Sequence, residues 1–260
     1  MPSTPKLHRR TPWVYFRSVL QWFIGGIAMC IATLLVFTIG IVVPPYRLDP
    51  FLKIFCHVVI WISGIRITVH GLEKLDPKKA YLFIFNHINI FDHFVMYASM
   101  PHRLRGVEKE VHFRWPVYGW FIRRIGQVSI PPRGDTTRAL QSLDRAKKVI
   151  EDGISVAMAP EGTRSRDGEL QPFKKGAFHL AIQMNATIVP LILVGMYKIN
   201  RKKDWLIYPG PIDVYFEDPI EVSKIPEPDP RRLSEQVRSI FVQRLYGDAG
   251  QNPVAAQGRK

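Results

Sequence analysis

The feature that most constrains this chain is a long apolar run near its N-terminus. Residues 19–43 read VLQWFIGGIAMCIATLLVFTIGIVV, without a charged side chain and with a single amide, that of Gln21. A helix of this length is long enough to cross the hydrocarbon core of a bilayer. A signal peptide fits less well, because the run is too long and ends at Pro44 and Pro45 instead of a small-residue cleavage site. The run therefore predicts a membrane helix, and a buried helix of a soluble protein is the alternative.

A second apolar run, residues 51–65, carries Lys53 and His57 and is short for a membrane span. It suits a tilted, re-entrant or interfacial helix, or else a helix in the core of a soluble protein. Basic residues precede the first run and follow the second, whereas the connection PPYRLDP is charge-balanced. The positive-inside rule then favours a hairpin with both ends on the cytoplasmic side. We therefore expect residues 1–65 to be a membrane-associated helical hairpin, with the active domain on the cytoplasmic face.

The overall charge indicates an anionic partner. The 260 residues carry a formal net charge of +14, which suits nucleic acid, an anionic membrane surface or a phosphorylated substrate. No nucleic-acid-binding motif accompanies the charge, so nucleic acid is disfavoured as a partner. The two cysteines, Cys30 and Cys56, both lie within apolar runs. They predict buried packing and exclude a disulfide framework or a cysteine-based metal site.

From residue 66 onward, strand-like segments alternate with helical patterns. Short apolar or alternating segments predict strands at 66–71, 81–86, 104–109, 127–132, 154–160, 187–195 and 212–222. Helical spacing of apolar residues predicts helices at 90–98, 115–126, 136–152, 175–184 and 230–246. This alternation predicts an α/β domain with a mainly parallel mixed sheet flanked by helices. We place that domain at residues 66–246 and expect residues 247–260 to be a mobile tail.

Polar residues directly follow the predicted strand LFIF, in the stretch NHINIFD, residues 86–92. On one ideal helix, five residues would separate His87 and Asp92 by about 140°, so they would not face each other. With His87 in a turn and Asp92 in the first helical turn, the carboxylate reaches one imidazole nitrogen and leaves the other free to take a proton. This is the base-and-orienter half of a Ser-His-Asp triad, and we expect the substrate's hydroxyl to be the nucleophile. The alternative is a helix cap without chemistry.

A second polar segment, APEGTRSRDGELQPFKKGAF, also follows a predicted strand. Arg164 offers a guanidinium fork suited to phosphate oxygens, and Glu161 can hold that fork or bind a hydroxyl. Thr163 and the backbone amides near Gly162 add hydrogen-bond donors. The segment lacks the Walker A pattern. Arg133, just beyond another short strand, is a further candidate ligand contact. A solvated charged loop and a surface arginine are the respective alternatives.

Together these segments resemble the lysophospholipid acyltransferase family, the glycerolipid acyltransferases that include 1-acylglycerol-3-phosphate acyltransferase. Residues 86–92 match the family motif N-H-x-x-x-x-D, and residues 160–165 match P-E-G-T-R-S letter for letter. Arg133 matches an arginine after a short strand, and Pro190 matches a proline within an apolar strand. The motifs occur in the family's order. One position differs: Ile88 stands where the family usually has glutamine.

The resemblance implies a mechanism that fits these residues. His87 would deprotonate the free glycerol hydroxyl of a lysophospholipid at the bilayer, and Asp92 would orient His87. The hydroxyl would attack the thioester of acyl-CoA or acyl-carrier protein, giving phosphatidic acid without a metal or cofactor. The expected acceptor-binding residues are Asn86, Arg133, Glu161, Gly162, Thr163 and Arg164. Another lysolipid acceptor and a non-catalytic lipid-binding protein are the alternatives, whereas a phosphate-ester hydrolase lacks an evident metal cluster or nucleophile.

Overall fold

A computed structural model describes residues 10–132 and 134–247 of the chain. Within these residues one mixed sheet runs in the order β1-β7-β6-β2-β5-β3-β4, and β8 pairs with β6. Most neighbouring strands are parallel, whereas β6 is antiparallel to β7 and β8. The predicted fold class is therefore confirmed. The strands are β1 (Ile65–His70), β2 (Leu82–Phe85), β3 (Leu104–Lys109), β4 (Val128–Ile130), β5 (Ser155–Met158), β6 (Thr187–Val194), β7 (Gly210–Phe216) and β8 (Ile220–Glu221).

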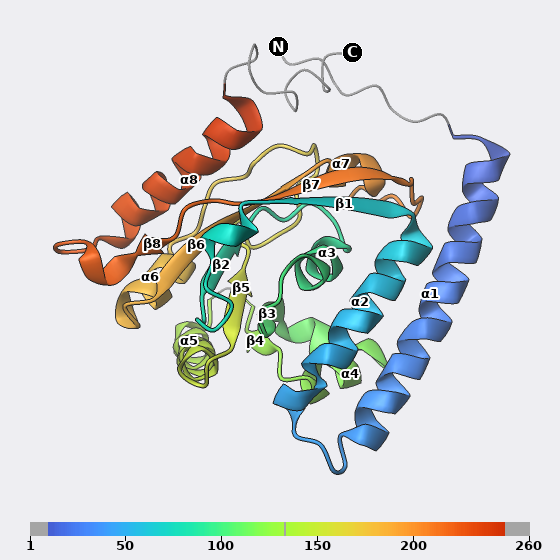
Figure 1. Cartoon of the computed structure of the whole chain (residues 1–260), viewed down its shortest axis with the longest axis horizontal. Helices are drawn as coiled ribbons and strands as arrows, with labels where there is room; N and C mark the ends of the chain where they lie inside the picture. Colours follow the sequence, from blue (N-terminus) through green and yellow to red (C-terminus); the bar gives the residue numbers. More distant parts are fainter. Residues whose placement is uncertain (1–9, 133, 248–260) are drawn as a thin grey trace.

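Helices cover both faces of the sheet (Figure 1). Helices α1 to α4 share one hydrophobic core with the sheet, and α5, α6 and α8 share the other. The helices are α1 (Pro12–Ile39), α2 (Asp49–Ser63), α3 (Asp92–Ser99), α4 (Tyr118–Arg124), α5 (Thr136–Glu151), α6 (Gly176–Gln183), α7 (Met196–Ile199) and α8 (Pro230–Tyr246). Short 3-10 helices are η1 (Pro45–Leu48), η2 (Leu72–Lys74), η3 (Glu110–Arg114) and η4 (Val222–Lys224).

Strand β2 shows why its sequence is apolar at every position. Phe83 and Phe85 belong to the core beside α1 to α4, whereas Leu82 and Ile84 belong to the opposite core. Successive side chains of a strand point to opposite faces, so a strand covered on both sides needs an unbroken apolar run. The result is a central strand whose carboxyl end delivers the polar residues that follow it.

The N-terminal helices α1 and α2 lie side by side as a hairpin at one side of the molecule (Figure 1). Helix α1 begins at Pro12, before the predicted apolar run, because Thr11 accepts a hydrogen bond from the Val14 amide and caps it. By length and composition, α1 is the one helix among the described residues that is suited to crossing a membrane. Only 17% of its most apolar window is buried within the protein.

Helix α2 instead shares the domain's core along one face. Leu52, Cys56 and Ile60 are buried there, whereas Trp61 points outward and is 81% exposed. At its start, Asp49 accepts two hydrogen bonds from Arg105 of β3, at 2.5 and 3.2 Å, and both side chains are buried. The second apolar run is thus an amphipathic helix fixed to the sheet. Its 15 residues are too short for a full span.

The largest differences between the predicted elements and the structure lie in two segments. The predicted strand at 212–222 is divided into β7 and β8, which are separated by a connection that contains Pro219. The predicted helix at 115–126 is shortened to α4, because Val117, directly before α4, has a φ of 60°, which lies outside the helical region. Residues 248–260, most of the predicted tail, lie outside the described residues.

The topology brings the two polar loops together. Strands β2 and β5 are parallel neighbours in the sheet, with Leu82 opposite Val156. Their carboxyl ends therefore reach the same edge, which is where ligands bind in open α/β sheets. The loop from β2 to α3 is residues 86–91, and the loop from β5 to α6 is residues 159–175. We call them the β2 loop and the β5 loop.

Candidate active site

The predicted contact between His87 and Asp92 is present. His87 Nδ1 lies 2.7 Å from Asp92 Oδ2. Asp92 is the first residue of α3, and the same oxygen accepts the backbone N–H groups of Ile88 at 2.7 Å and Asn89 at 3.0 Å. The aspartate is fully buried, whereas the His87 side chain is 21% exposed. A carboxylate held by several donors fixes the imidazole with its Nδ1–H toward the carboxylate, which leaves Nε2 able to accept a proton.

The Asn86 side chain bonds to the neighbouring strand β6. Its Nδ2 donates to the Leu193 carbonyl at 2.9 Å, and its Oδ1 accepts the Leu193 N–H at 2.8 Å. The side chain is only 1% exposed. The expected contact between Asn86 and the acceptor stays a prediction, and in the structure both polar atoms of the amide bond to Leu193. The amide clamps the end of β2 to β6 and fixes where the next residue, His87, leaves the sheet.

Both carboxylate oxygens of Glu161 also bond to backbone groups. Its Oε1 accepts the His87 N–H at 2.7 Å, and its Oε2 accepts the Gln171 N–H at 2.9 Å. Burial raises the pKa of Glu161 to about 6, while the two amide donors and His87 partly oppose the rise. The Ser165 N–H donates to the His87 carbonyl at 2.8 Å. The β5 loop thus bonds both peptide groups of His87, and the expected contact between Glu161 and the acceptor stays a prediction.

The remaining expected residues of the β5 loop lie near His87. Gly162 has a φ of 68°, a left-handed conformation that glycine adopts without strain, and its N–H donates to the Ala159 carbonyl. Lys202 Nζ donates to Thr163 Oγ1 and to the Arg164 carbonyl, each at 2.8 Å. Arg164 lines the same cavity as His87. No sequence pattern indicated a role for Lys202, which is 39 residues away from Thr163.

Several cations gather beside this cavity. Desolvation lowers the pKa of Lys202, and the charges of Arg166, Arg164 and Lys109 lower it further. Positive groups that destabilise one another in this way favour an anionic ligand between them. Arg133 lies outside the described residues, so its expected phosphate contact stays a prediction.

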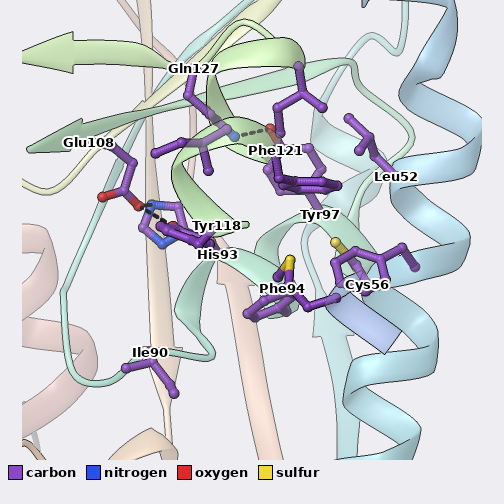
Figure 2. A pocket seen from close by; sticks show the side chains of 14 residues that line it. Leu52, Cys56, Ile90, His93, Phe94, Tyr97, Glu108, Tyr118, Phe121 and Gln127 are labelled. Carbon is purple, nitrogen blue, oxygen red and sulfur yellow. Dashed lines mark hydrogen bonds and ion pairs between the residues drawn. The ribbon is translucent and has the colours of Figure 1, made fainter. Parts of the chain in front are cut away.

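Two adjoining cavities lie between the sheet and the N-terminal helices. The larger has a volume of about 400 Å³ and is lined by His87, Arg164 and apolar residues of α1 and α2. The smaller, of about 60 Å³, is lined mainly by buried apolar side chains such as Leu52, Phe121 and Ile122 (Figure 2). Within the described residues, no group of three or more His, Cys, Asp and Glu side chains is arranged to hold a metal ion.

Two neighbours in the β2 loop explain its unusual sequence. Ile88 is 5% exposed and packs in the core on the side of α1 to α4, which accounts for an apolar residue at this position. Asn89 is fully buried, donates to the Met196 carbonyl at 2.7 Å and accepts the Phe91 N–H at 2.8 Å. Asn89 thus ties the loop to α7. Its only sequence signal was a polar residue within an apolar stretch.

Comparison with known proteins agrees with this geometry. The family model Acyltransferase matches residues 66–194. A 1-acyl-sn-glycerol-3-phosphate acyltransferase from Limnanthes douglasii is 36% identical over 208 residues, which cover 78% of this chain and 70% of that protein. A protein of the same name from Cocos nucifera is 30% identical over 245 residues, covering 90% and 78%.

The fold has a counterpart among solved structures. The crystal structure of the 1-acyl-sn-glycerophosphate (LPA) acyltransferase PlsC from Thermotoga maritima superposes with a TM-score of 0.75. It covers 87% of this chain and 92% of its own, at 19% identity, and it therefore supports the fold alone. The fold, the His87–Asp92 pair and the matched motifs define an acyltransferase enzyme. The chain belongs to the lysophospholipid acyltransferase family.

Proposed function

We propose that this protein transfers a fatty acyl group from acyl-CoA or acyl-carrier protein to the free hydroxyl of 1-acylglycerol-3-phosphate, giving phosphatidic acid. The observation that carries the proposal is the 2.7 Å contact between His87 and Asp92, in a cavity that Arg164 also lines. The names of the Limnanthes and Cocos relatives support this choice of acceptor. The cations around Lys202 support an acceptor with a phosphate group.

The mechanism follows from the positions of these groups. His87 Nε2 takes the proton of the glycerol hydroxyl as its oxygen attacks the thioester carbonyl carbon. Asp92 stabilises the imidazolium that forms, because its carboxylate already accepts the Nδ1–H. The C–O bond forms, the C–S bond breaks, and the leaving thiolate takes the proton back from His87. Arg164 binds the acceptor's phosphate, since a guanidinium fork matches two phosphate oxygens.

The bilayer is the proposed partner of helix α1. Its outward apolar side chains, such as Trp13, Phe23 and Leu34, are each more than 60% exposed in the isolated protein. A cavity lined by α1 and α2 then receives lipid directly from the membrane. We propose that the catalytic domain lies on the cytoplasmic face, because basic residues flank the hairpin.

The test uses the full chain purified in detergent, with 1-acylglycerol-3-phosphate and a labelled acyl thioester. We expect labelled phosphatidic acid from the native protein and at least about 1,000-fold slower formation from His87→Ala. Parallel assays with acyl-CoA and acyl-carrier protein identify the donor. Choline, ethanolamine and glycerol lysophospholipids serve as competing acceptors.

The outcomes separate the alternatives. A higher kcat/KM for another lysolipid would replace the proposed acceptor and keep the mechanism. Binding of lysolipid without transfer to any acceptor would favour a non-catalytic lipid-binding protein. Transfer that persists in His87→Ala would refute the assignment of the base.

A further inference from the structure

A buried polar cluster lies in the wall of the otherwise apolar cavity. Glu108 of β3 is 8% exposed, and its Oε2 accepts a hydrogen bond from His112 Nδ1 at 2.7 Å. Its Oε1 accepts the Tyr118 hydroxyl at 3.2 Å and lies 3.5 Å from His93 Nε2. We call His93, Glu108, His112 and Tyr118 the polar neck. Figure 2 shows Glu108, His93 and Tyr118 close together, away from the apolar side chains Leu52 and Cys56.

The polar neck lies at the boundary between the two cavities. His93, Glu108 and Tyr118 line both the cavity of His87 and the smaller apolar cavity. The rings of His87 and His93 are 5.9 Å apart. The reacting carbonyl must come within about 3.5 Å of the attacking oxygen at His87. A chain that extends from there into the smaller cavity therefore passes the polar neck within its first few carbons.

The polar groups of the neck would not strengthen the binding of a plain hydrocarbon chain. Burying a carboxylate is costly unless it is paired and hydrogen-bonded. Burial on its own would raise the pKa of Glu108, but His93 and His112 lower it to about 2, so the carboxylate is ionised. Ile90, Phe94 and Phe55 line the same cavities and show that apolar residues fit there. The charge is thus maintained inside a lipid-sized space.

One polar atom of the neck is unsatisfied. His93 Nε2 is buried, and its 3.5 Å contact with Glu108 Oε1 is long and does not form a hydrogen bond. Burial lowers the pKa of His93, and the charge of the Glu108 carboxylate opposes this shift. A buried polar atom without a hydrogen bond destabilises the protein unless a ligand satisfies it. A hydroxyl group fits, because it can bond to His93 and donate to Glu108 Oε1 at once.

We propose that the polar neck selects acyl donors that carry a hydroxyl group on one of the first few carbons from the thioester. This inference rests on the proposed function, since it takes the cavity beside His87 to be the acyl site. His93 and Glu108 are then specificity-determining residues that bind the chain's hydroxyl, and His112 and Tyr118 position the Glu108 carboxylate. A plain acyl chain leaves His93 Nε2 unpaired and is discriminated against.

The experiment compares 3-hydroxyacyl-CoA with unsubstituted acyl-CoA of the same length, with 1-acylglycerol-3-phosphate as acceptor and the full chain in detergent. We expect kcat/KM to be at least about tenfold higher for the 3-hydroxy donor, because a site built for a hydroxyl rejects the analogue that lacks it. His93→Phe should bring the ratio to within about twofold of one. Glu108→Gln, which keeps the shape and loses the charge, should reduce it to about threefold.

Matched controls separate the hydroxyl contact from general damage. Ser63→Ala removes a hydroxyl from the wall of the same larger cavity, but this hydroxyl already donates to the Val59 carbonyl of its own helix. The variant should keep the wild-type ratio of the two donors. A donor with its hydroxyl near the far end of the chain should lack the advantage. The melting temperature of each variant reports whether it is folded.

A binding measurement keeps the inference apart from the proposed function. Free 3-hydroxy and unsubstituted fatty acids of equal length are titrated, and their dissociation constants are compared. We expect at least about tenfold tighter binding of the hydroxy acid to the native protein, and loss of that difference in His93→Phe. Equal binding, or a preference only for acceptors with an extra hydroxyl, would overturn the inference. Preferential binding without acyl transfer would overturn the proposed function alone.

Discussion

The β2 loop and the β5 loop meet at one edge of the sheet, but their polar side chains differ in burial and in what they bond to. In the β2 loop, the side chains of Asn86 and Asn89 are buried and bonded to backbone groups. In the β5 loop, Arg164 and Thr163 are partly exposed beside the cavity. The first loop fixes a reacting group, and the second presents charge to a ligand. Variants of the two loops should therefore affect different kinetic constants.

The largest effect is expected at the β2 loop. His87→Ala should lower kcat by about 1,000-fold and leave the KM for 1-acylglycerol-3-phosphate within about threefold, because the base acts in the transition state. Steady-state kinetics over a range of acceptor concentrations measure both constants. His179→Ala is the matched control, since His179 is exposed on α6 and away from the loop. A change in KM without a change in kcat would show that His87 binds the acceptor and does not act as the base. The two loops would then not differ in the kinetic constant that they affect.

The β5 loop should respond in KM. Arg164→Ala should raise the KM for the acceptor by about 30-fold with kcat within about threefold, because a phosphate contact is present before and during the reaction. Arg164→Lys should recover only part of the loss, since lysine lacks the planar fork. Arg166→Ala, an exposed neighbour in the same loop, should change KM less than Arg164→Ala. Equal effects at both arginines would indicate a diffuse charge effect.

Glu161 is an exception to this difference between the loops. It lies in the β5 loop, but its carboxylate accepts the backbone N–H of His87 in the β2 loop. Burial raises its pKa to about 6, so the folded state favours the protonated carboxyl. The stabilisation is complete below the ordinary pKa of about 4.5 and is lost as pH rises through about 6. Relative to Glu161→Gln, the wild-type free energy of unfolding should fall by about 2 kcal/mol between pH 4.5 and 7.5.

Denaturant unfolding of both proteins at several pH values, in the same detergent, tests this prediction. The difference between the two proteins isolates residue 161, because the other titrating groups are common to both. If the wild-type free energy of unfolding instead rises with pH relative to Glu161→Gln, the hydrogen bonds from the His87 and Gln171 amides lower the pKa of Glu161 more than burial raises it.

The smallest effect is expected at Lys202. Lys202→Met should raise the acceptor KM by about fivefold, because it removes one cation and the two bonds that hold Thr163 and Arg164. Lys203→Met, at an exposed neighbouring position, is the matched control and should change KM by less than twofold. An effect on kcat without one on KM would show that Lys202 acts on the β2 loop instead.

The local parts of this site could be predicted from sequence, and the non-local parts could not. The His87–Asp92 contact spans five residues, and its geometry follows from a turn before a helix. The role of Asn86 depends on β6 lying beside β2, and that of Glu161 on β5 lying on the other side. Neither adjacency is written in the spacing of the motifs. For this reason the Asn86 amide and the Glu161 carboxylate were predicted to contact the ligand, and their bonds to the protein backbone were not predicted.

The fold shows the same division. Strand β3 and helix α8 match the predicted bounds, because each has a strong local pattern with clear ends. The division between β7 and β8 was missed, because a strand pattern continues across Pro219. The polar neck was missed as a cluster, since Glu108, His112 and His93 come from β3, η3 and α3. Only the packing of these elements brings them together.

The buried ion pair between Asp49 and Arg105 bears on how a water-soluble form of this enzyme should be engineered. Deleting residues 1–65 would remove the aspartate and leave the Arg105 guanidinium, 2% exposed, without its carboxylate. Unpairing a buried charge costs about 3–5 kcal/mol, a large part of a domain's stability. The N-terminal hairpin and the sheet therefore depend on each other for stability. A soluble form requires new polar residues on the outward side of α1, with the hairpin itself retained.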